Sequence, residues 1–576
     1  MIRSEIRKTI EAAVKSTFGD IAVPDFSVAA PENSEHGDYA TNVAMLLARV
    51  VKKNPMEIAE ALVRQLTIDN IQLTTTVAVP GFINFRLPDE VLQKEFSEIL
   101  KRQEKYGSGA KKKEKINLEF VSANPTGPLT MANGRGGFLG DVLANILEKV
   151  GYDVIREYYI NDAGFQITKL GESIFKAQNR FPFDIVFEYK AEYVKELANK
   201  IKLNNLDGVK LAALIIKAKD KFDVAKKVYS GLDKENQIIG MRMLLDNPRD
   251  KKNYDDLCSK YGYIACDELV SLIRLSLKKA GIKHDVWFSE EQNLHKKKEL
   301  QKALELLRKK GLVNKKDGAE WLDDNVVIKS DGQSTYFLAD LAYHYDKFVK
   351  RKFDIAIDVW GADHHGYVAR MKNGMQAFGI DSNRLHILIT QFVRLVKDGE
   401  EVRMSKRAGE FITLDELLEE VGLDAARFFF LMHSPDTHMD FDLDLAKKHS
   451  MDNPVYYVQY AHVRCQSILA KSQITNNKSQ IKPKIQILNT TEERALIKKL
   501  FQFPEVVEDT ARDYQAHRLT RYATELAGEF HNFYEKHRVI TEDEAINEAR
   551  LALVVAVKIV LGSVLDLLGV SKPERM

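Results

Sequence analysis

Apolar residues between positions 116 and 160 follow a two-residue period, then a helical one, then a two-residue period again. An alternating run covers residues 116–121, and an extended run covers residues 154–160. Between them the apolar residues recur at helical spacing: Phe138, Val142, Ile146 and Val150. This order predicts a strand, a loop, a helix and a second strand, the unit at which α/β sheets bind nucleotides.

The patterns elsewhere divide the chain into further segments. Helical spacing near the N-terminus is followed by a closing strand at residues 82–87, and a lysine-rich run begins at residue 111. A second α/β region has strands at 326–328 and 355–360, and amphipathic helical patterns dominate the last part. The segments that we predict are 1–108 (small α+β domain), 109–170 (first half of a Rossmann-like α/β domain), 171–320 (mostly helical insertion), 321–385 (second half of the α/β domain), 386–450 (connecting region) and 451–576 (all-α domain).

Charge and cysteine content exclude some classes of protein. The 576 residues include 85 basic and 83 acidic ones, a formal net charge of +2, so global charge does not predict nucleic-acid binding. The three cysteines lack the spacing of a disulfide framework or of a metal site, so we expect a reducing, cytosolic setting. The apolar stretch 551–570 is broken by Lys558 and Asp566 and predicts a buried helix, not a membrane span.

The loop after the first strand has the residue types of a phosphate site. Residues 124–128 read Asn-Pro-Thr-Gly-Pro, and two prolines prevent this segment from continuing the strand. Four glycines between 134 and 140 lie where the helix begins, and small residues there let backbone N–H groups approach phosphate. No GxxxxGK[ST] loop is present. Taken alone, the glycines fit a structural turn as well as a phosphate site.

A second candidate is the segment from Glu401 to Gly409. It places three cations within five residues ahead of a glycine, which suits a loop that neutralises a polyphosphate. By itself such a segment is more typical of a solvated basic turn.

The two segments together resemble the paired signatures of class I aminoacyl-tRNA synthetases. The resemblance is to the arginyl-tRNA synthetase family and extends over essentially the whole chain. Six further stretches carry it: 37–42 (GDYATN), 80–85 (PGFINF), 156–164 (REYYINDAG), 360–367 (WGADHHGY), 452–462 (DNPVYYVQYAH) and 573–576 (PERM). It implies an additional tRNA-binding domain at 1–108, a catalytic domain in the middle and an anticodon-binding domain at 451–576.

The resemblance also implies the amino-acid site. It assigns arginine binding to Ser122, Asn124, Tyr336, Asp340 and His364. Tyr336 and Asp340 are four residues apart and share one face if the segment is helical. A carboxylate binds guanidinium with a bidentate geometry that lysine does not match. Without the resemblance, Asp340 would be interpreted as a surface acid and His364 as a structural histidine.

For the nucleotide, the resemblance implies ATP accompanied by Mg²⁺ and no tightly bound metal. Catalysis then rests on positioning and on stabilising charge at the phosphoryl oxygens. The expected catalytic residues are Lys406, Arg403, Thr130 and Asn133. The expected ATP-binding residues are Pro125, Thr126, Gly127, Pro128, Leu129, Met131, Ala132, Gly134, Arg135, Met404, Ser405 and Arg407.

The departure from the family lies at residues 130–133, Thr-Met-Ala-Asn, where the family usually has His-hydrophobic-Gly-His. Threonine and asparagine donate hydrogen bonds but cannot be cationic. Losing one pre-organised donor typically costs about 2.7–4 kcal/mol of transition-state stabilisation. We hypothesise that the two substituted donors, with Lys406 and Arg135, retain activity.

The same resemblance implies tRNA(Arg), L-arginine and ATP as partners, a cytoplasmic monomer, and no role for DNA or a membrane. The residues expected at the tRNA surface are Tyr39, Asn84, Phe85, Tyr456, Tyr460, Tyr534 and Met576. Aromatic rings stack on unpaired bases, although aromatics at helical spacing more often belong to a core.

Two other functions remain open at this point. One is a synthetase paralogue with impaired catalysis that acts as a tRNA-binding protein, which the altered residues 130–133 favour. The other is an adenylate-forming enzyme that does not use tRNA, against which the full-length anticodon-type domain counts.

Overall fold

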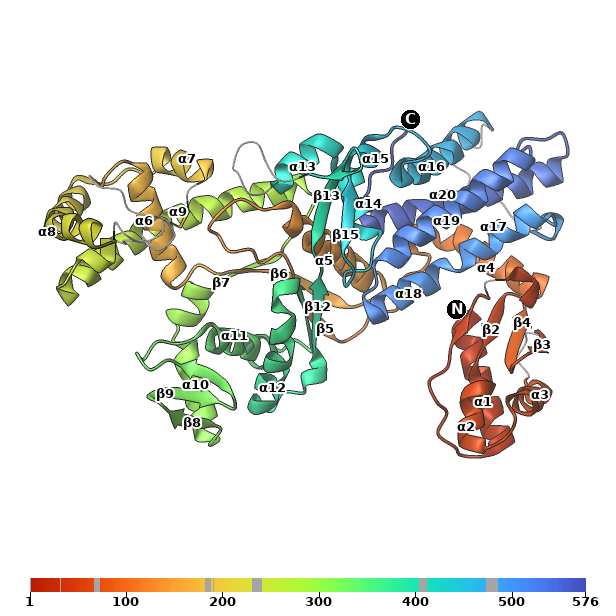
Figure 1. The fold of residues 1–576 in the computed structure, drawn as a ribbon. Coiled ribbons are helices and arrows are strands. Elements are labelled where there is room, and N and C mark those ends of the chain that lie inside the picture. Colours follow the sequence, from red (N-terminus) through yellow and green to blue (C-terminus); the bar gives the residue numbers. More distant parts are fainter. Residues whose placement is uncertain are drawn as a thin grey trace. The chain divides into compact units, whose positions relative to one another are not determined.

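The computed structural model describes residues 2–31, 33–66, 73–181, 188–189, 191–229, 241–402, 412–472 and 485–576. The chain forms two compact units. The first contains residues 1–110, 149–151 and 449–576, and the second contains residues 111–148 and 152–448. Figure 1 labels many of the elements of both units.

A five-stranded parallel sheet forms the centre of the second unit. Its strands are β5 (Lys115–Glu119), β6 (Asp153–Ile160), β7 (Val286–Ser289), β11 (Ile355–Gly361) and β12 (Leu385–Thr390), in the order β12-β11-β5-β6-β7. Helix α5 (Met131–Lys149) connects β5 to β6. Its side chains at 138, 142 and 146 are buried, as the helical spacing requires. The predicted strand–loop–helix–strand unit is therefore confirmed, with a helix that begins earlier than its apolar pattern.

The helical insertion ends about forty residues before the predicted boundary at 320. Its helices are α6 (Phe165–Ala177), α7 (Glu192–Lys200), α8 (Asn205–Tyr229) and α9 (Pro248–Lys279), which follows a 3-10 turn at Met241–Leu244. They enclose a core of their own that includes Ile174, Leu214 and Tyr261. Strand β7 then rejoins the parallel sheet beside β6. Residues 286–289 thus belong to the parallel sheet and not to the insertion.

Two smaller sheets complete the second unit. Strands β8 (Val313–Lys316), β9 (Ala319–Leu322) and β10 (Asn325–Ile328) form an antiparallel sheet in the order β10-β9-β8, so the strand predicted at 326–328 is real but lies outside the parallel sheet. Strands β13 (Val393–Lys397), β14 (Glu400–Glu401) and β15 (Met439–Asp442) form the other. The remaining helices are α10 (Glu299–Lys309), α11 (Tyr336–Tyr345), α12 (Val368–Phe378), α13 (Leu414–Val421), α14 (Leu423–Leu431) and α15 (Leu443–Lys447).

The first unit begins with the predicted α+β segment. Helices α1 (Ile2–Phe18), α2 (Val43–Val51) and α3 (Pro55–Gln65) accompany an antiparallel sheet of β1 (Val28–Ala29), β2 (Tyr39–Thr41), β4 (Phe82–Arg86) and β3 (Thr74–Ala78), in that order. Helix α4 (Asp89–Arg102) follows and packs on helices near the C-terminus. The two ends of the chain, predicted as separate domains, therefore share one compact unit.

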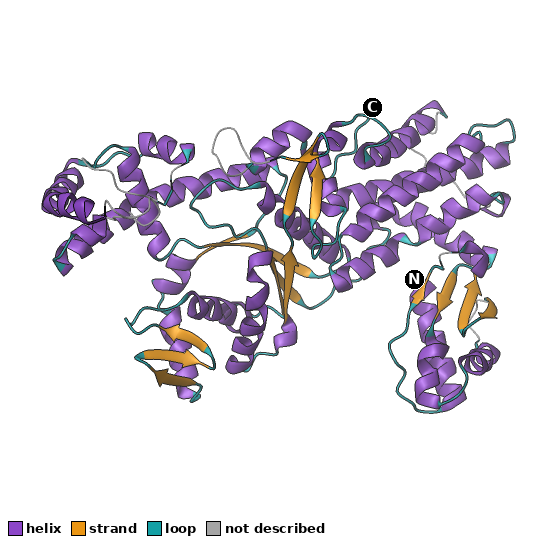
Figure 2. Cartoon of the chain, viewed as in Figure 1, coloured by secondary structure: helices purple, strands orange, loops and turns teal. Residues whose placement is uncertain are grey.

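The C-terminal part is helical, as predicted. Its helices are α16 (Pro454–Lys471), α17 (Thr491–Phe501), α18 (Phe503–Asp513), α19 (His517–Lys536) and α20 (Glu544–Leu568), and its described residues form helices and loops (Figure 2). Among the described helices, α20 is long and apolar enough to cross a membrane, but most of its residues are buried against α16, α19 and α4. This is the packing of a core helix, as the sequence indicated.

Candidate active site

The parallel sheet has a topological switch point between β5 and β11. These strands pair in register from Ile355 beside Ile116 to Asp358 beside Glu119, and chain connections run outward in opposite directions from them. The loop after β5 and the short helix η7 (Ala362–Tyr367) after β11 therefore leave the sheet at the same edge. Open α/β sheets bind ligands at this place.

The first turn after β5 is strained and held by β6. Val121 and Ser122 have φ angles of 69° and 38°, in the left-handed region that residues other than glycine rarely adopt. The Ser122 hydroxyl oxygen accepts the backbone N–H of Tyr159 at 3.0 Å. Asn124 is exposed, and its side-chain oxygen accepts from Asn161 at 3.1 Å. Hydrogen bonds to Tyr159 and Asn161 thus hold the strained turn in place at the edge of the sheet where ligands bind.

Thr130 and Asn133 bond to each other at the start of α5. The backbone N–H and the hydroxyl of Thr130 both donate to the Asn133 side-chain oxygen, at 2.8 and 2.9 Å. The Asn133 backbone N–H donates to the Thr130 carbonyl at 3.0 Å. Thr130 therefore directs its proton inward, contrary to the expectation that both residues donate to a nucleotide. The N–H bonds of the Asn133 amide are not used in this pair.

Residues 412–414, which follow the basic segment 401–409, are hydrogen-bonded to residues 129–131. Leu414 donates its N–H to the Leu129 carbonyl, and Met131 donates to the Ile412 carbonyl, both at 2.9 Å. Thr413 forms a β-bridge with Thr130 and caps α13. The expected loop residues themselves lie outside the described residues: Arg403, Met404, Ser405, Lys406 and Arg407. Ile412, the first described residue after these, nevertheless lies beside the segment 129–131.

Arg135 and the glycines of α5 have structural roles in this fold. Arg135 is only 2% exposed, and its guanidinium donates to four backbone carbonyls, those of Gln391, Phe392, Ser434 and Thr437. It holds loops in place and does not offer its charge to ATP. The glycines of α5 are buried and serve close packing, because a Cβ on Gly140 would lie 2.2 Å from the ring of Phe120.

A cavity of about 940 Å³ opens beside the switch point. Tyr336 and Asp340 both line it from α11, which confirms that they share one helical face. His364 lines it from η7. Neither Ser122 nor Asn124 is among the described residues that line it. The acids around this cavity are Glu290, Asp324, Asp340 and Asp363.

Asp340 is the strongest candidate for binding a cation. Burial raises the pKa of its carboxyl group to about 7, and the hydrogen bond from the Tyr367 hydroxyl, at 2.6 Å, opposes this rise. Burial disfavours the carboxylate form of Asp340, the Tyr367 hydroxyl and His344 offset this only in part, and a bound guanidinium would stabilise the carboxylate further. The cavity is therefore poised to gain electrostatic stabilisation from a cationic ligand.

Glu290 is a second buried carboxylate of the cavity, which sequence reasoning missed. It is 4% exposed, and one of its oxygens lies 3.0 Å from Nε2 of His295, whose pKa it raises. It follows β7 directly and precedes a π-helical turn (Glu291–His295), a feature found often at functional sites. Its neighbour β7 is only four residues long, so the sequence carried no strong signal for this position.

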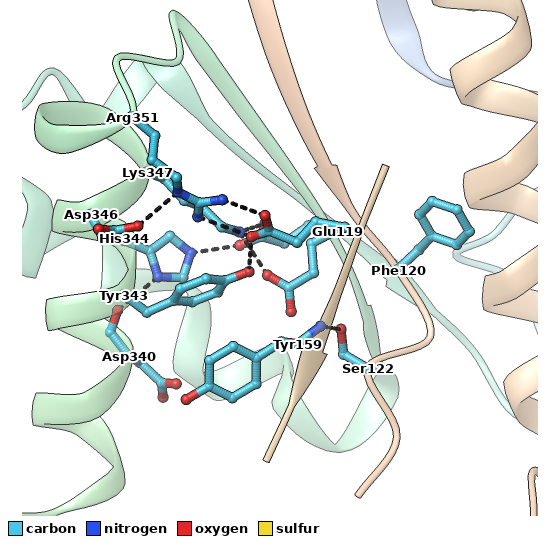
Figure 3. Close-up of polar contacts among 12 residues, drawn as sticks. Glu119, Phe120, Ser122, Tyr159, Asp340, Tyr343, His344, Asp346, Lys347 and Arg351 are labelled. Atoms are coloured by element: carbon cyan, nitrogen blue, oxygen red, sulfur yellow. Dashed lines mark hydrogen bonds and ion pairs between the residues drawn. The ribbon is translucent and has the colours of Figure 1, made fainter. Parts of the chain in front are cut away.

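A buried ionic network anchors α11 against the sheet (Figure 3). Nζ of Lys347 lies 2.6 Å from Glu119 Oε2 and 2.8 Å from Asp358 Oδ1. His344 contacts Asp358 with Nε2 at 2.6 Å and the Asp340 carbonyl with Nδ1 at 2.8 Å. Burial opposes the charge on Lys347, but Asp358 and Glu119 outweigh it, and its pKa is raised. The network therefore fixes the helix that presents Asp340.

The residues expected at the tRNA surface fall into two groups in the first unit. Tyr39, Asn84 and Phe85 are buried, and Tyr39 donates to Glu505 at 2.7 Å. Their side chains form part of the core because β2 and β4 are central strands of their sheet, and they are not exposed on the surface of this unit.

The second group is accessible. The rings of Tyr456 and Tyr460 stack with centroids 6.3 Å apart. The Arg464 guanidinium lies over both Tyr460 and Tyr534, 5.1 and 5.2 Å from the ring centroids. Tyr534 is 36% exposed and Met576 is 45% exposed. Aromatic rings with a cation among them suit stacking on unpaired bases.

Three family models match the chain. They are described as "Arginyl tRNA synthetase N terminal domain" over residues 4–87, "tRNA synthetases class I (R), catalytic domain" over 95–203 and 215–441, and "DALR anticodon binding domain" over 458–576. The matches follow the predicted order of domains.

Relatives match over the full length. A protein named arginine–tRNA ligase from Desulforamulus reducens is 42% identical and covers 100% of this chain and 99% of its own. Another from Carboxydothermus hydrogenoformans is 43% identical over 98% and 97% of the two chains. The solved structure of a putative arginyl-tRNA synthetase from Campylobacter jejuni is 31% identical, with a TM-score of 0.68, over 85% of this chain and 100% of that one. The synthetase from Thermus thermophilus, 23% identical with a TM-score of 0.77 over both full chains, shares the fold.

Proposed function

The chain belongs to the arginyl-tRNA synthetase family, and from this premise we propose how its own residues carry out the ATP-dependent attachment of arginine to tRNA. The arginine carboxylate attacks the α-phosphorus of ATP and pyrophosphate leaves. The arginyl group of the adenylate then passes to the 3′ end of tRNA(Arg), and AMP is released.

Arginine recognition rests on the acid-lined cavity, which is the observation that carries the proposal. Asp340 and Glu290 approach from α11 and from the end of β7, so a guanidinium between them would meet two carboxylates. The Tyr367 hydroxyl orients Asp340, and His295 orients Glu290. Tyr336 and His364 line the same cavity and contribute walls to the pocket. Ser122 supports the turn after β5, and Asn124 faces the α-amino and carboxylate end.

The phosphates of ATP lie at the start of α5. The Asn133 amide donates to the nucleotide while Thr130 holds its oxygen, and Lys406 and Arg403 neutralise charge on the triphosphate. The ATP site is lined by two sets of residues. From the loop after β5 and the start of α5 come Pro125, Thr126, Gly127, Pro128, Leu129, Met131, Ala132 and Gly134, and from the segment 401–409 come Met404, Ser405 and Arg407. Mg²⁺ arrives with ATP, whose phosphate oxygens are its usual ligands.

The tRNA is held by the helical part of the first unit. Tyr456, Tyr460 and Tyr534 stack on unpaired bases, and Met576 lies near the same RNA. The three cysteines are buried and unpaired, which fits the reducing cytoplasm. We place the enzyme there as a monomer without DNA or a membrane as a partner.

ATP–pyrophosphate exchange with arginine and tRNA(Arg) tests the proposal. Labelled pyrophosphate enters ATP only if the adenylate forms reversibly at this site. Exchange that depends on arginine supports working donors at residues 130–133. No exchange above background, with tRNA still bound, would favour the impaired paralogue.

A further inference from the structure

Strands β6 and β7 end side by side at the edge of the sheet next to the acid-lined cavity. They are parallel, and their last residues, Ile160 and Ser289, are paired. Asp162 follows Ile160 by two residues, and its backbone N–H donates to the Ile160 carbonyl at 2.9 Å, which turns the chain sharply. The Asp162 carboxylate therefore lies beside the residues that follow β7.

Asp162 holds the residues on both sides of Glu290. Its Oδ2 accepts the Ser289 hydroxyl at 2.5 Å, and its Oδ1 accepts the Glu291 backbone N–H at 2.9 Å. The Ser289 hydroxyl oxygen also accepts the Gln292 N–H at 3.0 Å, so the first two N–H groups of the π-helical turn are both satisfied. Hydrogen bonds to an ionised carboxylate are stronger than those between neutral groups. One carboxylate thus fixes the backbone before and after Glu290.

The Glu290 side chain has its own hydrogen bonds. One of its oxygens lies 3.0 Å from Nε2 of His295, and the Tyr159 hydroxyl forms another hydrogen bond with this carboxylate. Glu290 lines the cavity, whereas Asp162 is not among the described residues that do so. Asp162 therefore supports from behind a carboxylate that faces the ligand space.

The same loop is joined to Asn124, which we assign to the α-amino and carboxylate end of arginine. Asn161, the neighbour of Asp162, donates its side-chain N–H to the Asn124 side-chain oxygen at 3.1 Å. Gln166 of α6 donates to both the backbone carbonyl and the side-chain oxygen of Asn161, each at 2.7 Å. Residues 161 and 162 thus connect the groups assigned to the two ends of the substrate. The separation of those groups determines which length of side chain fits.

We propose that Asp162 is a positioning residue for arginine recognition, which fixes the backbone around Glu290 and thereby makes the site selective for the length of the arginine side chain. The proposal rests on the proposed function, because it gives a role to a residue behind the groups that contact arginine there. A carboxylate on a fixed backbone cannot retreat to admit a longer side chain, and an unsupported one can. Small displacements of a positioned group have large effects on substrate use.

Arginine and homoarginine, which is one methylene longer, test this in ATP–pyrophosphate exchange with tRNA(Arg) present. The unaltered protein should prefer arginine by about 10- to 200-fold in kcat/KM, the usual effect of one methylene. Asp162→Ala should raise the KM for arginine about 10- to 100-fold, change kcat less, and reduce the preference several-fold. Asp162→Asn, which keeps an acceptor for the Glu291 N–H, should recover most of the preference. Asp381→Ala removes a comparable capping bond, at the short helix Ser382–Arg384 of the same unit, and should change neither value.

A double variant separates positioning from a purely structural role. If Asp162 acts through Glu290, Asp162→Ala combined with Glu290→Gln should raise the KM for arginine no further than Glu290→Gln alone, whereas independent effects would multiply. If Asp162→Ala does not fold, Ser289→Ala, which removes one of the two bonds, provides the same comparison.

Two results would overturn the positioning role and leave the proposed function standing. They are effects that multiply in the double variant, and an unchanged preference for arginine over homoarginine in Asp162→Ala. A KM for arginine that does not respond to Glu290→Gln would instead contradict the arginine site of the proposed function, and the positioning role with it.

Discussion

Asp340 and Asp358 carry the same side chain, and their surroundings shift its pKa in opposite directions. At Asp340, burial raises the pKa to about 7, and the Tyr367 hydroxyl and His344 oppose this rise only in part. At Asp358, burial acts the same way but is outweighed by Lys347 and His344, and the pKa is lowered. The first carboxyl group has a place for a cation, and the second already has one. On this contrast we assign Asp340 to ligand binding and Asp358 to structural support.

The pKa of Asp340 predicts how arginine affinity depends on pH. The carboxylate form binds guanidinium, so the KM for arginine should fall as pH rises from about 6 to 8 and level off above the pKa. Tyr367→Phe removes a hydrogen bond that lowers this pKa, so the midpoint should move to higher pH. Steady-state kinetics at several pH values measure the profile. An identical midpoint in the variant would contradict the assignment.

Asp340→Asn should weaken arginine binding and, at pH 8, raise the stability of the protein. Loss of one partner of a buried charge pair costs about 2–5 kcal/mol in binding, so the KM for arginine should rise by roughly 30-fold or more. The folded-state pKa lies above the ordinary value of 3.8, so stability from this group is present below about pH 4 and is lost as pH rises through about 7. At pH 8 the variant should therefore resist urea better than the unaltered protein. Weaker arginine binding together with lower stability at pH 8 would point to misfolding instead.

The Thr130–Asn133 pair makes an asymmetric prediction. Asn133→Ala removes the proposed donor and should reduce ATP–pyrophosphate exchange about 100- to 1000-fold, the effect of about 2.7–4 kcal/mol. Thr130→Ser keeps the hydroxyl that holds Asn133 and should change the rate little. Comparable losses in both variants would contradict the division of roles between donor and holder.

At the scale of elements, Lys347 joins α11 to β5 and β11 through a π-helical turn (Asp346–Lys350). Lys347→Met would leave Glu119 and Asp358 without their cation and should lower the free energy of unfolding by about 3–5 kcal/mol. Lys309→Met, at the exposed end of α10, is the matched control and should change it by less than about 0.5 kcal/mol. Urea unfolding followed by circular dichroism compares them. Equal stability of the two variants would exclude the network as an anchor.

The elements also show which parts of the site a sequence reveals. The unit around α5 was predictable because its apolar periods change clearly, whereas the shared face of Tyr336 and Asp340 was predicted only on the condition that their segment is helical. Strand β7 was not, because four residues carry too little periodicity, and Glu290 was missed with it. The burial of Phe85 and the inward use of Arg135 depend on contacts with residues distant in the chain. Such contacts cannot be predicted from the type of a residue or from its position in a motif.

At the scale of the whole molecule, each compact unit has its own task. The second unit contains the switch point and the acid-lined cavity, and the first contains the accessible aromatic cluster with Arg464. Tyr534→Ala should raise the KM for tRNA about 5- to 150-fold, from about 1–3 kcal/mol of lost stacking, with the KM for arginine unchanged. Tyr39→Phe, a change at a buried hydroxyl of the same unit, should leave the KM for tRNA unchanged. Aminoacylation kinetics with varied tRNA provide both values, and an equal effect of the two variants would contradict the surface assignment.

Charging of tRNA with each of the twenty amino acids in turn, in the presence of ATP and Mg²⁺, tests the central claim most directly. The account predicts esterification of arginine alone, because only its side chain brings a guanidinium to Asp340 and Glu290, and release of AMP and pyrophosphate with each turnover. Charging with another amino acid, or no charging by a folded protein that binds tRNA, would contradict it.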